Sequence, residues 1–221
     1  MKPVQYAVIG LGRFGKSLAK ELMNLGYEVL GIDKEEEAVD EMADKLTHCV
    51  VADTTDEEVL KSLGIRNFDC AIVAIGDDIQ SSIMTAIMLK DLGVRQVVAK
   101  AMSELHGKVL TKIGVDRIIY PERDMGVRVA HQLVSPNLLD FIELSPEYTL
   151  VELTVPKHLS GKSLKNLDLR ARYGCSVVAI NKQKKVLIAP VADDILYEDD
   201  IMVVIGTNKQ VAAFEREVSR E

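Results

Sequence analysis

The sequence predicts an α/β protein: a Rossmann-like, doubly wound parallel sheet followed by a second, smaller α+β domain. Between residues 6 and 120, short apolar segments alternate with helical stretches of roughly ten or more residues, the rhythm of right-handed βαβ crossovers. A glycine-rich turn follows the first apolar segment, as nucleotide-binding domains of this class require. From residue 150 apolar and polar residues alternate, which is typical of half-exposed strands.

Six apolar segments are predicted to be the strands of the first domain. They are rich in Val and Ile and barely alternate with polar residues, as expected for strands covered on both faces. They lie at residues 6–10, 28–33, 48–53, 69–76, 96–101 and 117–121. Six strands with their helices complete a doubly wound domain.

A longer helical segment follows the sixth strand and ends before Pro136. Its apolar residues at near-helical spacing are Met125, Val129, Leu133 and Val134. Two interpretations stay open: the helix packs on its own sheet, or it presents an apolar face to a partner. We place the first domain at 1–135, with this helix, a candidate dimerisation helix, at 122–135. The proline-containing segment 136–148 is predicted to be a hinge.

The second domain is predicted at 149–221 as antiparallel strands with two short helices. Residues 150–156 alternate apolar and polar side chains, so they are expected to form a half-exposed strand. Residues 175–190 are predicted to form a hairpin with a polar turn near 181–184, and a last strand precedes a helix that begins at Asn208.

Composition and charge exclude several classes of protein. The chain of 221 residues carries a net charge of −7, and up to Asp140 it holds 16 basic against 22 acidic residues, so a broad basic face for nucleic acid is not expected. Cys49, Cys70 and Cys175 show neither a disulfide framework nor a zinc pattern. No segment approaches the ~20 apolar residues of a membrane span, so we expect a soluble, cytoplasmic protein.

The glycine motif carries the strongest functional signal. Gly10, Gly12 and Gly15 follow a predicted strand and open a predicted helix. Gly10 gives a tight turn, Gly12 lets the backbone approach a phosphate, and Gly15 permits close helix packing. Asp33 ends the second strand, where a carboxylate accepts hydrogen bonds from ribose hydroxyls. The alternative is a glycine turn and a strand-end aspartate without a ligand.

Arg13 lies inside the motif, in the first turn of the predicted helix. A cation there opposes the helix dipole at a cost of about 0.3–1 kcal/mol when no anion is present. The terminal phosphate of ADP or ATP would reverse that sign, because it adds charge that the backbone amides do not already neutralise. The alternative is a solvent-facing arginine.

Asp53 and Thr54 end the third predicted strand, at the sheet edge where ligands of such folds bind. They are candidates to line the adenine of a nucleotide. The alternative is a purely structural turn, because Thr55 and Glu58 have the spacing of a helix capping box.

Three further candidates follow later strands. Gly76 can admit a ligand close to the backbone or simply end its strand, and Lys100 can balance phosphate charge or reach solvent. Glu122 can bind a divalent cation that rides on nucleotide phosphates, but the helix dipole alone also favours a carboxylate there.

Catalytic signatures are missing from the sequence. The four histidines are scattered, neither H-E-x-x-H nor G-x-S-x-G occurs, and "SGKS" at 160–163 lacks the leading glycine of a P-loop. About 80 residues after the first domain leave little room for a substrate domain. We therefore expect a nucleotide sensor and no enzyme.

Longer motifs extend over essentially the whole chain, among them "YAVIGLGRFGKSLAKEL", "VVADTTDEEVLKSLGIRNFDCAIVAIG" and "YPERDMGVRVAHQLVSPNLLD". In these motifs the sequence resembles the regulator-of-potassium-conductance family, with TrkA-N and TrkA-C domains, and in particular the cytoplasmic gating subunits of bacterial Ktr-type potassium uptake systems. The resemblance implies a non-enzymatic subunit that binds ATP and ADP and forms an octameric ring beneath a membrane channel, peripheral to the inner face of the cell membrane.

The resemblance also implies roles for particular residues. Gly10, Gly12 and Gly15 would hold phosphates and Asp33 the ribose, while Asp53 and Thr54 would flank adenine and Lys100 would lie near the phosphates. Arg13 would reach the terminal phosphate bound in the neighbouring subunit, and Glu122 would help hold Mg²⁺ or Ca²⁺ between subunits. The predicted nucleotide site is completed by the neighbours Phe14, Lys34, Ile75 and Gly76.

The tail resembles a domain that binds cyclic di-AMP at a dimer interface in several relatives. The matching positions are Leu164, Leu169, Arg170, Ala171, Val177 and Pro190. Apolar side chains would cover the bases and Arg170 would meet a phosphate. From the residues alone, Leu164, Leu169 and Val177 are expected to be plain core.

A second hypothesis comes from another class of protein. Asp33 permits NAD(H) as well as an adenine nucleotide, so an NAD-dependent oxidoreductase or an NADH-responsive redox regulator stays open.

Overall fold

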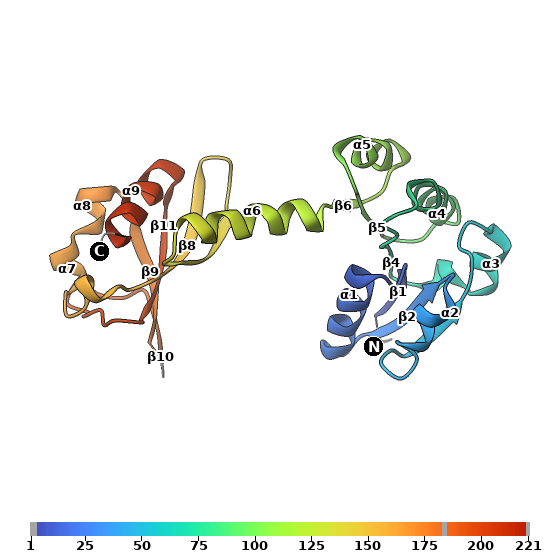
Figure 1. Ribbon diagram of the computed structural model, residues 1–221, viewed down its shortest axis with the longest axis horizontal. Coiled ribbons are helices and arrows are strands. Elements are labelled where there is room, and N and C mark those ends of the chain that lie inside the picture. Colours follow the sequence, from blue (N-terminus) through green and yellow to red (C-terminus); the bar gives the residue numbers. More distant parts are fainter. Residues whose placement is uncertain (1–3, 183–184, 220–221) are drawn as a thin grey trace. The chain divides into compact units, whose positions relative to one another are not determined.

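A six-stranded, all-parallel sheet forms the first part of the chain (Figure 1). The computed structural model describes residues 4–182 and 185–219. The strands are β1 (Gln5–Ile9), β2 (Glu28–Asp33), β3 (His48–Val51), β4 (Cys70–Val73), β5 (Val97–Lys100) and β6 (Arg117–Ile119). Their order is β3-β2-β1-β4-β5-β6, so all six predicted strands and the doubly wound fold are confirmed.

Helices cover both faces of this sheet. They are α1 (Arg13–Asn24), α2 (Glu36–Asp40), α3 (Glu57–Ser62), the short 3₁₀ helix η1 (Ile65–Asn67), α4 (Ile79–Asp91) and α5 (Glu104–Ile113). Val8 packs with residues of α1 and α2, whereas its neighbour Ile9 packs with residues of α3, α4 and α5. Alternate residues of one strand therefore face two separate cores, which is why the strands show almost no polar positions.

The strand order shows at which edge of the sheet a ligand is expected to bind. From β1 the chain runs outward through β2 and β3 and then returns to β4 on the other side of β1. Ile9 pairs with both Ile32 and Val73, so the carboxyl ends of β1, β2 and β4 are level. In a doubly wound sheet this switch point opens a crevice between the loops that follow the strands.

The predicted long helix is α6 (Pro121–Val134), with a proline at its first position, where the missing N–H costs nothing. No residue of α6 is buried. The second half of α6 contacts β7 (Leu138–Glu143). Gln132 donates to the Leu139 carbonyl at 2.5 Å and the His131 and Phe141 rings lie 4.8 Å apart.

The chain divides into two units, Met1–Glu122 and Arg123–Glu221. This division lies at the first turn of α6, and the second half of the helix packs on β7. The domain boundaries predicted at 135 and 149 stay predictions. The segment 136–148, predicted to be a hinge, contains β7, whose Phe141 pairs with Val151. Its role as a hinge stays a prediction.

The second unit contains a five-stranded antiparallel sheet in the order β10-β9-β11-β8-β7. Its further strands are β8 (Tyr148–Thr154), β9 (Ser176–Lys182), β10 (Lys185–Ile188) and β11 (Ile201–Thr207). Its helices are η2 (Lys157–Leu159), α7 (Leu164–Leu167), α8 (Leu169–Tyr173) and α9 (Asn208–Val218). The predicted hairpin, the last strand and its helix are confirmed, while turn residues 183 and 184 lie outside the described residues.

Candidate functional site

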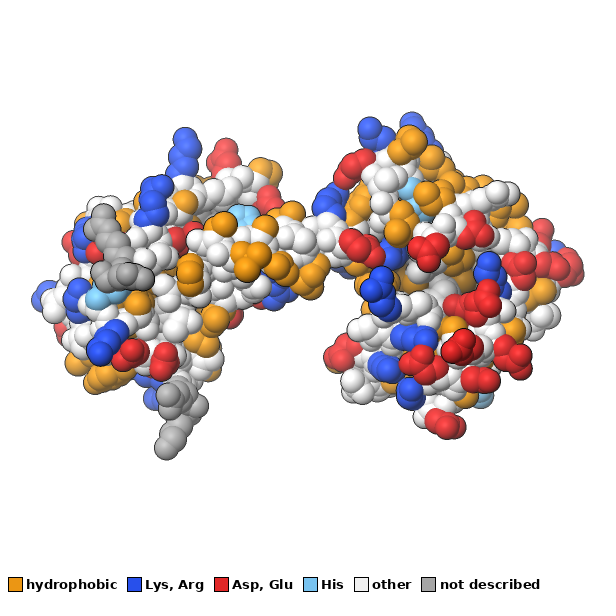
Figure 2. Space-filling view, in the orientation of Figure 1, with side chains coloured by type: hydrophobic (Ala, Val, Ile, Leu, Met, Phe, Trp, Pro, Cys, Tyr) orange, Lys and Arg blue, Asp and Glu red, His pale blue; other side chains and the backbone are white. Residues whose placement is uncertain are grey.

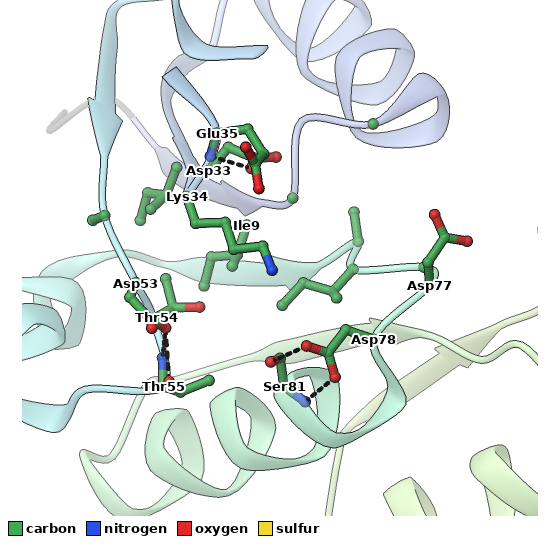
Figure 3. Close-up of a pocket in the computed structure, with 17 residues that line it drawn as sticks. Ile9, Asp33, Lys34, Glu35, Asp53, Thr54, Thr55, Asp77, Asp78 and Ser81 are labelled. Carbon is green, nitrogen blue, oxygen red and sulfur yellow. Dashed lines mark hydrogen bonds between the residues drawn. The ribbon is translucent and has the colours of Figure 1, made fainter. Parts of the chain in front are cut away.

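A cleft of about 340 Å³ lies at the carboxyl ends of β1, β2, β3 and β4 (Figure 3). It is at the switch point of the sheet, where doubly wound folds bind their ligands. The cleft brings together eight residues of the predicted nucleotide site: Gly10, Gly12, Asp33, Lys34, Asp53, Thr54, Ile75 and Gly76. It does not include Arg13, Phe14, Gly15 or Lys100.

The three glycines of the turn have different structural needs. Gly10 has a φ of +96°, and a Cβ there would lie 2.9 Å from the backbone nitrogen of Ile75. A Cβ on Gly15 would overlap the carbonyl oxygen of Gly10. Gly12 has an ordinary φ of −71°, and a Cβ there would meet nothing within 4 Å. The fold therefore requires Gly10 and Gly15, whereas Gly12 leaves open space beside the cleft.

The N-terminus of α1 carries no side-chain cap. Its N-cap is Gly12, its first turn contains no acidic residue, and its first residue is Arg13. By contrast, α3, α4 and α5 are capped by the side chains of Asp56, Asp78 and Ser103. The first N–H groups of α1 therefore lack a side-chain acceptor, and a cation adds to the positive end of the helix dipole. This arrangement suits an anion.

Asp33 is held in place by the backbone. Its Oδ2 accepts a hydrogen bond from the Leu11 N–H at 2.5 Å, and its Oδ1 accepts one from the Glu35 N–H at 3.0 Å. The carboxylate thus ties the glycine turn to the end of β2. Each oxygen keeps a lone pair, so the group is oriented and still able to accept from a ligand hydroxyl.

Asp53 and Thr54 are partly occupied by local contacts. Asp53 Oδ1 accepts from the hydroxyl of Thr55 at 2.7 Å and from its N–H at 2.9 Å, which holds the pKa of this carboxyl below its usual range. The Thr54 hydroxyl is buried and lies 2.9 Å from that of Thr85 on α4. Thr54 can therefore offer a ligand its backbone and methyl group more readily than its hydroxyl.

The capping box expected from Thr55 and Glu58 is wrong. The N-cap of α3 is Asp56, whose carboxylate accepts from the Glu58 N–H at 2.9 Å. Thr55 hydrogen bonds to Asp53 instead, so the N-cap of α3 lies one residue later than the spacing indicated.

Lys100 and Glu122 form an ion pair next to the cleft. Lys100 is only 7% exposed, so the expectation that it might reach solvent is wrong. Its Nζ lies 2.6 Å from Glu122 Oε1 and 6.0 Å from the centre of the Phe14 ring. The hydrogen bond from Lys100 holds the pKa of the Glu122 carboxyl below its usual range, and the charge of Arg13 adds a smaller effect in the same direction.

Among the described residues, Glu122 is not part of a cluster of metal-binding side chains. Over residues 4–182 and 185–219, no three His, Cys, Asp or Glu side chains are grouped so as to hold a metal ion. The carboxylate of Glu122 is paired with an ammonium group. A divalent cation would need further ligands from outside these residues.

Several residues of the cleft were not predicted. Asp78 caps α4 and accepts from the Ser81 N–H at 3.0 Å and from its hydroxyl at 2.6 Å, which lowers the pKa of the Asp78 carboxyl. The D-x-x-S spacing at a helix start could have identified this cap. In Figure 3 the Lys34 side chain extends into the cleft, whose rim also carries Glu35 and Asp77. Thr85 has no sequence signal, because only the tertiary fold brings it to Thr54.

The residues predicted for the second ligand differ in their exposure within the second unit. Leu169 is 5% exposed and belongs to the core, so its assignment as plain core is confirmed. Leu164 and Val177 are half-buried and pack against the same core. Ala171 and Arg170 are exposed, and Arg170 donates from Nη2 to the Ser176 hydroxyl at 3.3 Å.

Pro190 is half-buried. A cavity of about 520 Å³ in this unit is lined by Pro136, Asn137, Pro156, Lys157, His158, Val218 and Ser219. None of the six predicted positions lines it.

Comparisons with known proteins agree with this architecture. The TrkA-N domain matches residues 6–121 and the TrkA-C domain matches residues 148–219. The chain is 49% identical over 214 residues to Ktr system potassium uptake protein C of Bacillus subtilis (strain 168), covering 97% of each chain. It is 48% identical over 217 residues to Ktr system potassium uptake protein A of the same organism, covering 98% of each chain.

The fold also matches a solved channel structure. The GsuK channel bound to NAD superposes with a TM-score of 0.68 at 17% sequence identity, covering 100% of this chain and 40% of the channel chain. In the part of the chain that the structure describes, none of the helices has the length and apolar character needed to cross a membrane. On its domains and its identity to the Bacillus proteins, the chain belongs to the family of Ktr-type potassium uptake regulatory subunits built from a TrkA-N and a TrkA-C domain.

Proposed function

We propose that this protein is a cytoplasmic, non-enzymatic gating subunit of a Ktr-type potassium channel that binds ATP and ADP in the cleft of its first unit. The observation that carries the proposal is the uncapped N-terminus of α1, with Arg13 at its first position, beside the oriented carboxylate of Asp33. The helix N-terminus suits phosphates, Asp33 suits a ribose, and Arg13 favours a nucleotide with a charged terminal phosphate over NAD(H).

The gating mechanism would be a shift between two ring conformations. A ligand moves such an equilibrium only by its differential affinity for the two states, and a shift from 1:99 to 99:1 takes about 5.5 kcal/mol. If eight sites of an octameric ring share the load, each contributes about 0.7 kcal/mol. One arginine contact that ATP makes and ADP lacks is sufficient for this.

Nucleotide titration of the full-length protein tests the proposal. ATP should bind more tightly than ADP or NADH, and Arg13→Ala should weaken ATP binding at least about tenfold while leaving ADP binding nearly unchanged, because a hydrogen bond to a charged group contributes about 1.5–3 kcal/mol. Lys16→Ala is the matched control, since it removes a cation one turn further along α1 that pairs with Glu41 instead. A dominant affinity for NADH, or equal loss in both variants, would contradict the proposal.

The proposal also includes a divalent cation, cyclic di-AMP and a membrane channel as binding partners. A divalent cation, Mg²⁺ or Ca²⁺, would bind near Glu122 with ligands from nucleotide phosphates or a neighbouring subunit. The second unit would bind cyclic di-AMP between two copies, with Arg170 meeting a phosphate, because Arg170 is exposed and already engages a hydroxyl across to β9. The subunit would lie at the inner face of the cell membrane through its channel partner.

The exposed side chains of α6 support a role in dimerisation (Figure 2). Met125, Val129 and Leu133 are 55%, 43% and 78% exposed and follow one another at intervals of four residues. We expect Leu133→Glu to weaken self-association at least about tenfold in analytical ultracentrifugation, because an apolar side chain contributes about 1.5–3 kcal/mol when buried. Leu25→Glu, at an exposed leucine of the first unit, is the control; an equal effect of both changes would rule out a specific role for α6.

A further inference from the structure

The ion pair of Lys100 and Glu122 is asymmetric. Lys100 is 7% exposed, whereas the side chain of Glu122 is 64% exposed. A buried ammonium needs an anion, because water no longer solvates it, but an exposed carboxylate is well hydrated without a partner. Lys100 therefore requires an anion beside it, and Glu122 is an anion that can leave.

Lys100 lies next to a residue that lines the cleft. A Cβ on Gly76, a residue of the cleft, would be 3.7 Å from Lys100 Nζ. The ring of Phe14, the second residue of α1, is 6.0 Å from the same nitrogen. A phosphate chain that starts at Gly12 and the N-terminus of α1 would thus have this ammonium group nearby, in addition to Arg13.

We infer that Glu122 is a specificity-determining residue, which competes with the terminal phosphate of the nucleotide for Lys100. This inference rests on the proposed function, because it needs a nucleotide in the cleft. A terminal phosphate carries more negative charge than a carboxylate and offers more acceptor oxygens, so it displaces Glu122. AMP and adenosine lack the phosphate groups that would reach Lys100, so the ion pair of Lys100 and Glu122 stays intact when they bind.

Competition of this kind weakens nucleotide binding by a predictable factor. The apparent affinity falls in proportion to the fraction of molecules in which the lysine is free. A pair that leaves Lys100 free about a tenth of the time weakens binding of the terminal phosphate about tenfold. The site thereby filters its ligands by the length of the phosphate chain.

Calorimetric titration of the full chain with ATP, ADP and AMP, in EDTA so that no divalent cation contributes, tests the inference. Glu122→Gln should bind ATP about tenfold more tightly than the natural protein, ADP less so, and AMP with unchanged affinity. Asp124→Asn is the matched control: it removes the same charge from the same end of α6, but Asp124 pairs with Arg123. Unchanged or weaker ATP binding by Glu122→Gln overturns the inference.

A double variant that also lacks Lys100 distinguishes direct competition from long-range electrostatics. In Lys100→Gln the further change Glu122→Gln should no longer improve ATP binding, because the contested cation is gone. A gain that persists there, or an equal gain in Asp124→Asn, means that general charge and not competition is responsible.

ATP binding by the same set of proteins distinguishes a failure of this inference from a failure of the proposed function. Glu122→Asp keeps the charge but is one methylene shorter, so it should give an intermediate ATP affinity; an affinity equal to that of the natural protein counts against the inference. If none of the proteins binds an adenine nucleotide, the proposed function fails and the inference with it. If ATP binds and Glu122→Gln changes nothing, the inference fails alone.

Discussion

Gly15→Ala is expected to lower the free energy of unfolding by about 3 kcal/mol, the upper end of the usual cost of overpacking. The added Cβ would overlap the Gly10 carbonyl oxygen, which is backbone and cannot rotate away. Gly10 cannot retreat freely, because its N–H donates to the Ile32 carbonyl at 2.8 Å and its own Cβ position faces the backbone of Ile75. Chemical denaturation of the full chain, followed by circular dichroism, measures the change.

Gly12→Ala is the matched control in the same turn. Its Cβ would meet nothing within 4 Å and its φ of −71° suits alanine, so stability should fall by less than about 1 kcal/mol, the cost of alanine at an N-cap. ATP affinity should nevertheless fall about tenfold or more, because the methyl group occupies the space through which a phosphate approaches the backbone. Equal stability losses in both variants would contradict the separate roles assigned to the two glycines.

Asp33→Asn is expected to weaken ATP binding at least about tenfold while keeping most of the stability of the fold, since hydrogen bonds to a charged group contribute about 1.5–3 kcal/mol. The amide oxygen of asparagine can still accept from the buried Leu11 N–H, although its NH₂ group cannot accept from the exposed Glu35 N–H, and the ribose hydroxyls lose a charged acceptor. Asp33→Ala leaves the Leu11 N–H without its acceptor and should also lower the free energy of unfolding by about 1–3 kcal/mol. Titration and denaturation of both variants separate the two roles.

Glu36→Gln controls for the loss of charge. Glu36 is exposed at the first turn of α2 and does not line the cleft. It should leave both ATP affinity and stability nearly unchanged. If Asp33→Asn weakened ATP no more than Glu36→Gln, Asp33 would hold the loop without contacting the nucleotide.

The parallel sheet was predictable because its signal is local. Each strand is a short apolar segment rich in Val and Ile, and each is followed by a helix, so the local sequence pattern predicts the βαβ units. The predicted strand at 28–33 matches β2, Glu28–Asp33, and the close packing that the motif predicts at Gly15 agrees with the position of its Cβ, which would overlap the Gly10 carbonyl oxygen. Such features depend on backbone conformation and periodicity, which a single segment carries.

Strand β7 was not predicted, for the opposite reason. The prolines at 136 and 146 indicated a hinge, but they flank a strand whose Phe141 pairs with Val151 of β8. The capping box at Thr55 and Glu58 was likewise wrong, because Asp53 offered Thr55 a closer acceptor. In both cases a contact partner, and not the local pattern, selected the conformation.

The sequence by itself determined the fold class, the glycine turn and the candidate anion site, because each depends on residues close together in the chain. Only the tertiary structure decided the states of Lys100 and Glu122. It buried Lys100 against Glu122, 22 residues away. Burial and ion pairing depend on which distant segments meet, and the free energy of a charge is set by those neighbours.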